Sequence, residues 1–159
     1  MSVRRAEPDE AGALTRLINS AFGPAEDFFV HGDRISVDGV RERFDTGMFL
    51  VTEDYGGCVY VELRGDRAYF GLLSVDPALQ GQGLARRLIA AAEGHAFSHG
   101  CGFMDISVVN LRTELPPLYR KFGYVETGAE PWPDDVPTKL PCHFICMTKD
   151  LSKQGGNAN

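Results

Sequence analysis

Residues 72–90 read LLSVDPALQGQGLARRLIA, and this stretch decides the fold. It runs from an apolar segment through Asp76-Pro77 into a loop with Gly81 and Gly83, and then into residues with apolar positions at helical spacing. Glycines let a backbone approach a ligand closely, and the free N–H groups and dipole at the start of a helix attract an anion such as a pyrophosphate. The stretch therefore predicts a strand, an anion-binding loop and a helix.

Two other phosphate-binding loops do not fit this stretch. A P-loop needs a Lys directly after its glycines, and none is present here. A dinucleotide-binding loop needs a third glycine where Arg86 stands. A loop that uses its glycines only to turn remains an alternative at this point.

Hydrophobic periodicity and turn residues predict the remaining elements. The expected order is strand, helix, helix, a meander of three strands, helix, strand, helix, strand and strand. The ranges are Val3–Ala6, a helix from Pro8 that ends at Gly23-Pro24, Val40–Phe44, Met48–Glu53, Cys58–Leu63, Arg67–Val75, Leu84–Ser98, Phe103–Val109, Pro116–Lys121, Tyr124–Thr127 and His143–Thr148. This order predicts an α/β (α+β) fold with a mixed, mainly antiparallel sheet and helices on its faces.

The amino-acid composition and net charge exclude some classes of protein. The 159 residues are 43% hydrophobic and 24% charged, which is typical of one globular domain and excludes a disordered chain. We expect this domain at residues 1–151 and a frayed polar tail at 152–159. The net charge of −6 argues against binding to nucleic acid. An apolar segment near ~20 residues and a secretory leader are both missing, so we expect a cytoplasmic protein without membrane contact.

Two motifs in the right order resemble the GNAT superfamily of acyl-CoA-dependent N-acyltransferases. The first is Gln80-x-x-Gly83-x-Ala85, and the second is Leu118-Tyr119-Arg120-Lys121-Phe122-Gly123-Tyr124. The resemblance implies a seven-strand sheet that is splayed at its central strands, with about four helices on its faces. It also implies N-acetyl transfer from acetyl-CoA to a primary amine by direct attack in a ternary complex. A non-catalytic sensor or structural module that binds coenzyme A or an acyl-CoA is the alternative.

The resemblance also assigns residues to the coenzyme A site. The strand end at Leu73 and Val75 would pair with the pantetheine arm, beside a β-bulge. Asn110 would contact the pantetheine or stabilise the splay, unless it is only a turn residue after the strand. The main-chain N–H groups that would hold the pyrophosphate belong to Gln80, Gly81, Gln82, Gly83, Leu84 and Ala85, and Arg86 would add a charged contact.

Tyr119 matches the family's tyrosine near the thioester sulfur, where a phenol can protonate the departing thiolate. Its alternative is an aromatic residue that packs between helix and sheet. Many family members carry a glutamate base on the strand before the loop, but Tyr69 occupies that position here. The remaining candidates for the base are Glu62, Glu114 and His143. A solvated or core-edge role is the alternative for each of these three side chains.

In this family two segments shape the acceptor site, and here they are 22–34 and 130–143. Their aromatic and acidic residues would suit a cationic acceptor. These residues are Asp27, Phe28, Phe29, His31, Glu130, Trp132, Asp134 and Asp135. The acceptor remains open between a small molecule and a peptide or protein amine, and a homodimer is implied because relatives often form one. His95 and His99 have no evident third ligand, so no metal is expected.

Overall fold

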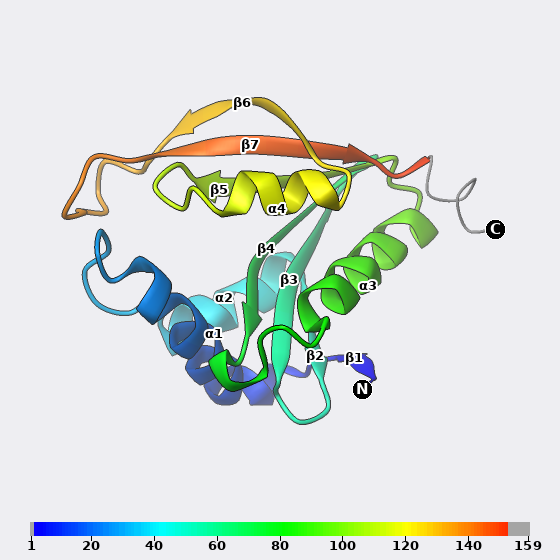
Figure 1. The fold of residues 1–159 in the computed structure, drawn as a ribbon. Coiled ribbons are helices and arrows are strands. Elements are labelled where there is room, and N and C mark those ends of the chain that lie inside the picture. Colours follow the sequence, from blue (N-terminus) through cyan, green and yellow to red (C-terminus); the bar gives the residue numbers. More distant parts are fainter. Residues whose placement is uncertain (1, 153–159) are drawn as a thin grey trace.

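The computed structural model describes residues 2–152, and within them the chain forms one seven-stranded sheet in the order β1-β2-β3-β4-β5-β7-β6 (Figure 1). Residues 153–159, which hold most of the predicted tail, lie outside the described part. The strands are β1 (Val3–Arg5), β2 (Met48–Thr52), β3 (Gly57–Arg64), β4 (Arg67–Val75), β5 (Phe103–Val109), β6 (Val125–Pro131) and β7 (His143–Asp150). The helices are α1 (Ala11–Glu26), α2 (Val37–Thr46), α3 (Leu84–Ser98) and α4 (Leu115–Lys121), with short 3-10 turns η1 (Pro8–Glu10) and η2 (Pro77–Leu79).

The sheet opens between its two central strands. Strands β4 and β5 are parallel and pair only from Arg67↔Phe103 to Tyr69↔Asp105. All other neighbouring strands are antiparallel, and β5 stays paired with β7 to Val109↔Phe144. Beyond Tyr69, β4 follows β3 while β5 follows β7, so the two central strands diverge (Figure 1). The predicted mixed and splayed sheet is confirmed.

A β-bulge in β4 accompanies this divergence. The pairing of β3 with β4 passes from Cys58↔Ser74 to Tyr60↔Gly71, so β4 has one extra residue opposite Val59. Leu72 adopts a φ of 53°, and its carbonyl accepts a hydrogen bond of 2.9 Å from the Ser74 hydroxyl. A bulge bends its strand and increases the local twist. The second half of β4 is therefore aimed away from β5.

The two faces of the sheet carry separate hydrophobic clusters. Helices α1 and α2 cover one face, where Leu14, Ile18 and Val40 are fully buried. Helices α3 and α4 cover the other face, where Leu88 and Tyr119 are buried. Apolar residues at helical spacing explain both packings, because each helix must bury one stripe. No helix in residues 2–152 is long and apolar enough to cross a membrane.

Several predicted boundaries were wrong. Helix α2 runs over Val37–Thr46 rather than Val40–Phe44, because Ser36 caps its N-terminus. Helix α1 does not end at Gly23-Pro24 but continues to Glu26, because Pro24 lacks only its own N–H donor while the Asp27 N–H still bonds to the Gly23 carbonyl. Strand β6 extends to Pro131, beyond the predicted Thr127, because β7 pairs with it as far as Pro131↔His143. The end of α1 is set by a local hydrogen bond, whereas the end of β6 depends on pairing with another strand.

Candidate active site

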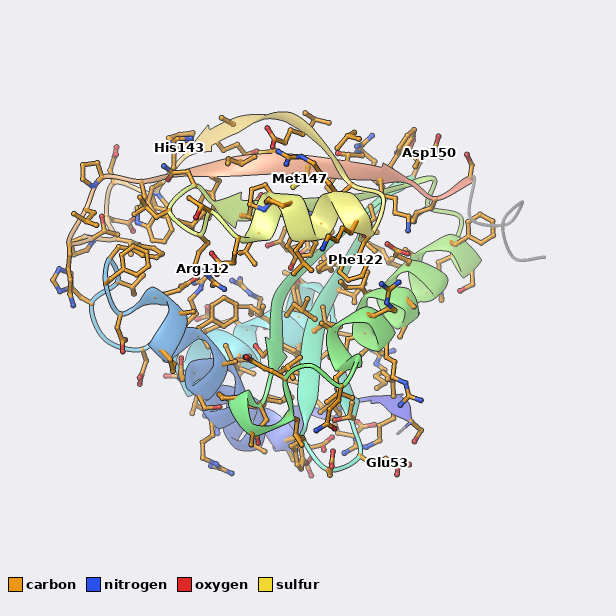
Figure 2. All side chains as sticks on the ribbon, in the orientation of Figure 1. Glu53, Arg112, Phe122, His143, Met147 and Asp150 are labelled. Carbon is orange, nitrogen blue, oxygen red and sulfur yellow. The ribbon has the colours of Figure 1, made fainter. Side chains whose placement is uncertain are left out.

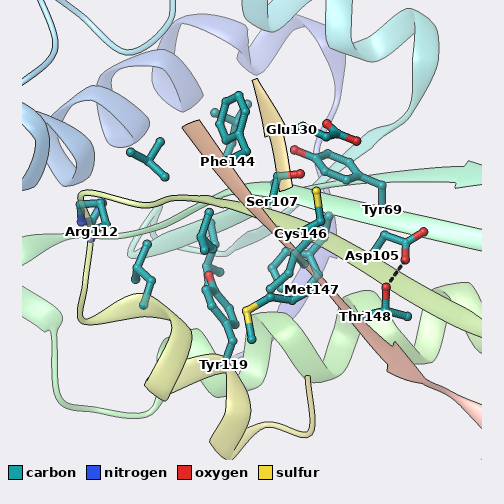
Figure 3. Close-up of a pocket in the computed structure, with 18 of the residues that line it drawn as sticks. Tyr69, Asp105, Ser107, Arg112, Tyr119, Glu130, Phe144, Cys146, Met147 and Thr148 are labelled. Atoms are coloured by element: carbon teal, nitrogen blue, oxygen red, sulfur yellow. Dashed lines mark hydrogen bonds between the residues drawn. The ribbon is translucent and has the colours of Figure 1, made fainter. Parts of the chain in front are cut away.

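The gap between β4 and β5 holds a cavity of about 810 Å³ (Figure 3). Its walls come from the diverging strands, from α1, α2 and α4, and from the segment that joins β6 to β7. The lining residues on β4 and β5 include Tyr69, Gly71, Leu72, Leu73, Asp105, Ser107, Val108 and Val109. In a continuous sheet the main chains of β4 and β5 would pair with each other here. Because the strands diverge, these main-chain groups form the wall of the cavity instead.

The loop before α3 has the properties of an anion cradle. Gly81 and Gly83 have φ values of 85° and 81°, and a Cβ atom at either residue would meet no atom within 4 Å. No described residue accepts a hydrogen bond from the main-chain N–H groups of residues 80–86. These unpaired donors and the open space fit a diphosphate at the N-terminus of α3. The guanidinium of Arg86 stacks 4.9 Å from the Phe122 ring, at the C-terminus of α4.

Tyr119 enters the cavity from α4 (Figure 3). Its side chain is buried against Phe70 and Tyr124, with ring centroids 6.1 and 6.0 Å away. No described residue hydrogen-bonds to its hydroxyl, although a buried hydroxyl normally has a partner. Burial raises the pKa of Tyr119 to about 12, so the phenol holds its proton at neutral pH. The cavity therefore contains a proton donor that has no hydrogen-bond partner among residues 2–152.

The three residues predicted as candidate bases do not line the cavity. Glu62 on β3 accepts a hydrogen bond of 2.6 Å from Tyr60 and pairs with Arg64. Burial would raise the pKa of Glu62, but these two partners outweigh it and the pKa is lowered. His143 is exposed at the start of β7 (Figure 2). Glu114 is exposed and pairs with Arg112 at 2.8 Å.

Three of the predicted coenzyme A residues lie on or next to the two central strands. Leu73 lines the cavity beside the bulge, whereas Val75 does not line it and pairs with Gly57 of β3. The Asn110 side-chain oxygen accepts the His143 N–H at 2.8 Å, and the Asn110 N–H donates to the His143 carbonyl at 2.9 Å. Asn110 thus joins the end of β5 to the start of β7, which supports the expectation that it stabilises the splay.

The two predicted acceptor segments do meet at the cavity, but only some of their residues line it. Phe22, Glu130 and Trp132 belong to the lining, and the Trp132 ring stacks on Phe144 at 5.1 Å. Glu130 has no cation within 4.0 Å among the described residues. The predicted residues that stay outside the lining are Asp27, Phe28, Phe29, His31, Asp134 and Asp135. Of the predicted acceptor residues, Glu130 and Trp132 therefore line the cavity.

Arginines are the charged residues that sequence reasoning missed. The lining holds five arginines and three carboxylates, namely Arg34, Arg43, Arg64, Arg67, Arg112, Glu26, Asp105 and Glu130. Each arginine comes from a different helix, strand or connecting segment. No spacing in the sequence marks them as a group, so only packing brings them together.

Two of these arginines hold the cavity's framework. Arg67 donates to Asp105 at 2.8 and 2.7 Å, and this carboxyl has a lowered pKa because of the Arg67 hydrogen bonds. Arg112 donates to Glu26 at 3.1 Å and so connects the segment after β5 with the end of α1. Burial raises the pKa of Glu26, while Arg34 and Arg112 oppose that shift.

Comparison with known proteins adds three findings. Residues 23–137 match the family model described as an acetyltransferase (GNAT) domain. The chain is 30% identical over 94 residues to acetyltransferase Atu2258 of Agrobacterium fabrum, and the match covers 57% of this chain and 66% of that relative, just under two thirds of its length.

Solved structures share the fold. The ribosomal-protein-S18-alanine N-acetyltransferase of Escherichia coli superposes with a TM-score of 0.74 at 16% identity, covering 94% of this chain and 93% of the other. The structure of yncA from Salmonella typhimurium with its cofactor acetyl-CoA gives a TM-score of 0.68 at 20% identity, covering 95% and 94%.

Proposed function

The chain belongs to the GNAT family of acetyltransferases, and on that basis we propose that it transfers acetyl from acetyl-CoA to a primary amine in a ternary complex. The observation that carries this proposal is that the splayed end of β4 and the Tyr119 side chain line one cavity. The start of α3, with its unpaired N–H groups, lies next to the end of α4 that carries Tyr119, because Arg86 stacks on Phe122. A module that only binds coenzyme A has no need of the phenol.

Acetyl-CoA would supply an activated acyl group as a thioester. The unpaired N–H groups of residues 80–86 would hold its diphosphate, and the bulged part of β4 around Leu73 would pair with its pantetheine arm. The acetyl-CoA in the yncA structure supports this donor, because the two chains share the fold over nearly their whole length.

In the transfer step the acceptor nitrogen forms a bond to the acetyl carbon while the carbon–sulfur bond breaks. The amine loses one proton, and the leaving thiolate gains one. Tyr119 is proposed as the donor of the second proton, because burial keeps its hydroxyl protonated and no described residue competes for it. Reprotonation of Tyr119 from solvent would complete the cycle.

Glu130 is proposed as the acceptor of the amine proton, in place of Glu62, Glu114 and His143. It is a carboxylate in the lining without an ion-pair partner among the described residues. It lies on β6 beside Cys146 of β7, where burial raises the thiol pKa of Cys146 and the Glu130 charge raises it further. Ionic partners occupy Glu26 and Asp105, the other two carboxylates of the lining.

The test follows thioester absorbance in mixtures of the protein, acetyl-CoA and a panel of primary amines. This signal is preferable to a thiol reagent, because Cys142 and Cys146 are only half-buried and would react as well. We expect amine-dependent loss of thioester and a mass increase of one acetyl group in the acceptor. Tight binding of coenzyme A without turnover on the whole panel would overturn the proposal in favour of the non-catalytic module.

Matched variants test the proton acceptor. Glu130→Gln should lower kcat about 100-fold, as expected for the loss of a general base. Glu126→Gln on the same strand should have little effect, because Glu126 pairs with Arg120 and does not line the cavity. If Glu62→Gln or His143→Gln lowers kcat as strongly as Glu130→Gln does, the assignment to Glu130 fails.

A further inference from the structure

The cavity differs in charge from the protein around it. The whole chain has a formal net charge of −6, but five arginines and three carboxylates line the cavity. Within residues 2–152, no Lys or His belongs to the lining. A positive cavity in an acidic protein attracts anions and disfavours a purely cationic acceptor.

Ion pairs neutralise three of the five arginines. Arg67 is paired with Asp105, and Arg112 with both Glu26 and Glu114. Arg64 is paired with Glu62, which lies outside the lining. These three arginines therefore have carboxylates of the protein as partners.

Arg34 and Arg43 differ from the other three. Arg43 has no carboxylate within 4.0 Å among the described residues, and Arg34 approaches only Glu26, at 3.9 Å. Neither guanidinium donates a hydrogen bond to any described residue. Glu26 accepts its hydrogen bond from Arg112, so the N–H groups of Arg34 have no acceptor among the described residues.

Aromatic rings hold both guanidinium groups in place. Arg34 lies 5.5 Å from the centroid of Phe22, and Arg43 lies 5.5 Å from the centroid of Tyr60. An aromatic ring that stacks on the flat face of a guanidinium holds it in place. The N–H donors at the edge of the guanidinium stay available for a ligand. The two arginines are thus ordered without having their hydrogen-bonding capacity used.

The Tyr69 side chain lies near three of the lining arginines. Arg34, Arg43 and Arg64 all act on its hydroxyl, and together they oppose the rise in the Tyr69 pKa that burial causes. The Arg64 guanidinium lies 4.7 Å from the Tyr69 ring. The Tyr69 hydroxyl occupies the space over Gly71, where any side chain would collide with it. The end of the cavity at Tyr69 is therefore a positive subsite, and Tyr119 reaches the cavity elsewhere, from α4 (Figure 3).

We propose that the acceptor is a small amine that also carries a carboxylate, as an amino acid does, and that Arg34 and Arg43 bind this carboxylate. The fork of a guanidinium matches the two oxygens of a carboxylate. Glu130, the lining carboxylate without an ion pair, would face the ammonium group of the same molecule. The inference rests on the proposed acetyl transfer and specifies which amines the site selects.

The experiment compares acceptors that differ only in the charge of one group. For each of several side chains, the amino acid, its neutral α-amide and the decarboxylated amine are assayed by loss of thioester. We expect kcat/KM for the carboxylates to exceed that for the amides at least tenfold. Equal or better use of amides and amines would overturn the carboxylate subsite while leaving acetyl transfer intact. Absence of turnover with every acceptor would instead overturn the proposed function.

Variants separate binding from chemistry. Arg34→Gln and Arg43→Gln should each raise KM for the amino acid about tenfold, while KM for acetyl-CoA and for the neutral amine stays the same. Arg41→Gln is the matched control, because Arg41 lies on α2 like Arg43, pairs with Asp38 at the surface and does not line the cavity. Unchanged KM values in both cavity variants would overturn the assignment of these two arginines.

A binding measurement does not depend on turnover. Calorimetry with coenzyme A present compares an N-acetyl amino acid with its N-acetyl amide. We expect the carboxylate to bind more tightly, and we expect that preference to weaken in Arg43→Gln and at high salt. Arg43→Lys serves where Arg43→Gln fails to fold, since it keeps the charge but loses the bidentate fork. Equal affinity for the two ligands in the wild-type protein contradicts the proposal.

Discussion

Arg67 on β4 and Asp105 on β5 are joined by two hydrogen bonds, from Nε to Oδ2 at 2.8 Å and from Nη2 to Oδ1 at 2.7 Å. Asp105 belongs to the last residue pair before the two strands separate, and Thr148 of β7 donates a further hydrogen bond of 2.6 Å to it. The three residues tie β4, β5 and β7 together at the closed end of the cavity. The ion pair thus lies at the point where the two central strands begin to separate.

Asp105→Asn should lower the free energy of unfolding by about 2 kcal/mol at pH 7, because charge-assisted hydrogen bonds are lost. The Arg67 hydrogen bonds lower the pKa of Asp105, so its contribution is present above the ordinary pKa of an aspartate and is lost as pH falls through the lower folded value. The difference from wild type should therefore shrink below about pH 4. Urea unfolding at several pH values measures it, with the surface variant Asp38→Asn as a control that should change little.

Arg112→Met should destabilise the protein by about 3 kcal/mol, because it leaves the buried Glu26 carboxylate with only Arg34 nearby. Burial raises the pKa of Glu26, so its folded form favours the proton, and stability from this group declines as pH rises through the folded pKa. The loss in Arg112→Met should accordingly be larger at pH 7 than at pH 4.5. The double variant with Glu26→Gln should recover most of the stability in urea unfolding, and a double variant as unstable as the single one would contradict this account.

Tyr119→Phe should reduce kcat about 100-fold and leave the affinity for coenzyme A unchanged. Stability should not fall, because the hydroxyl that is removed has no partner among the described residues. Tyr124→Phe is the comparison: its hydroxyl donates to buried Glu93 at 2.7 Å, so that variant should lose stability and keep its kcat. Steady-state kinetics and thermal unfolding distinguish the two, and an unaltered kcat in Tyr119→Phe would remove the proton-donor role.

The pH dependence gives an independent check on the same residue. Since burial raises the pKa of Tyr119 to about 12, the phenol stays protonated well above the ordinary tyrosine value near 10. A profile of kcat should therefore show no decline from loss of this proton up to about pH 10. A decline with an apparent pKa near 8 that disappears in Tyr119→Phe would contradict the assignment.

Gly81→Ala should weaken binding of coenzyme A about tenfold, because a left-handed φ of 85° costs an alanine about 1–2 kcal/mol and the loop must change shape to relieve it. Gly65→Ala carries the same kind of strain, with a φ of 72° and equally open space, but it lies in the turn between β3 and β4. Calorimetric titration should show a loss of affinity only in Gly81→Ala. Equal affinity in both variants would reject the cradle before α3.

Local signals in the sequence determined much of the architecture. The ranges of β4, α3 and β5 agree with their predictions residue for residue, because each has a strong hydrophobic period and ends at a turn residue. The glycine loop and Tyr119 could be proposed from the sequence, since both belong to short contiguous motifs, and Tyr119 lines the cavity.

Only the tertiary structure decided which charges share the cavity. Arg34 in the segment after α1, Arg43 on α2 and Glu130 on β6 all line it, although they are distant in sequence. The same packing leaves Glu62 on β3 with Tyr60 and Arg64 instead of in the cavity. A sequence pattern gives the spacing of residues that are neighbours along the chain. The net charge of a cavity depends on residues that come close together only when the helices and strands pack.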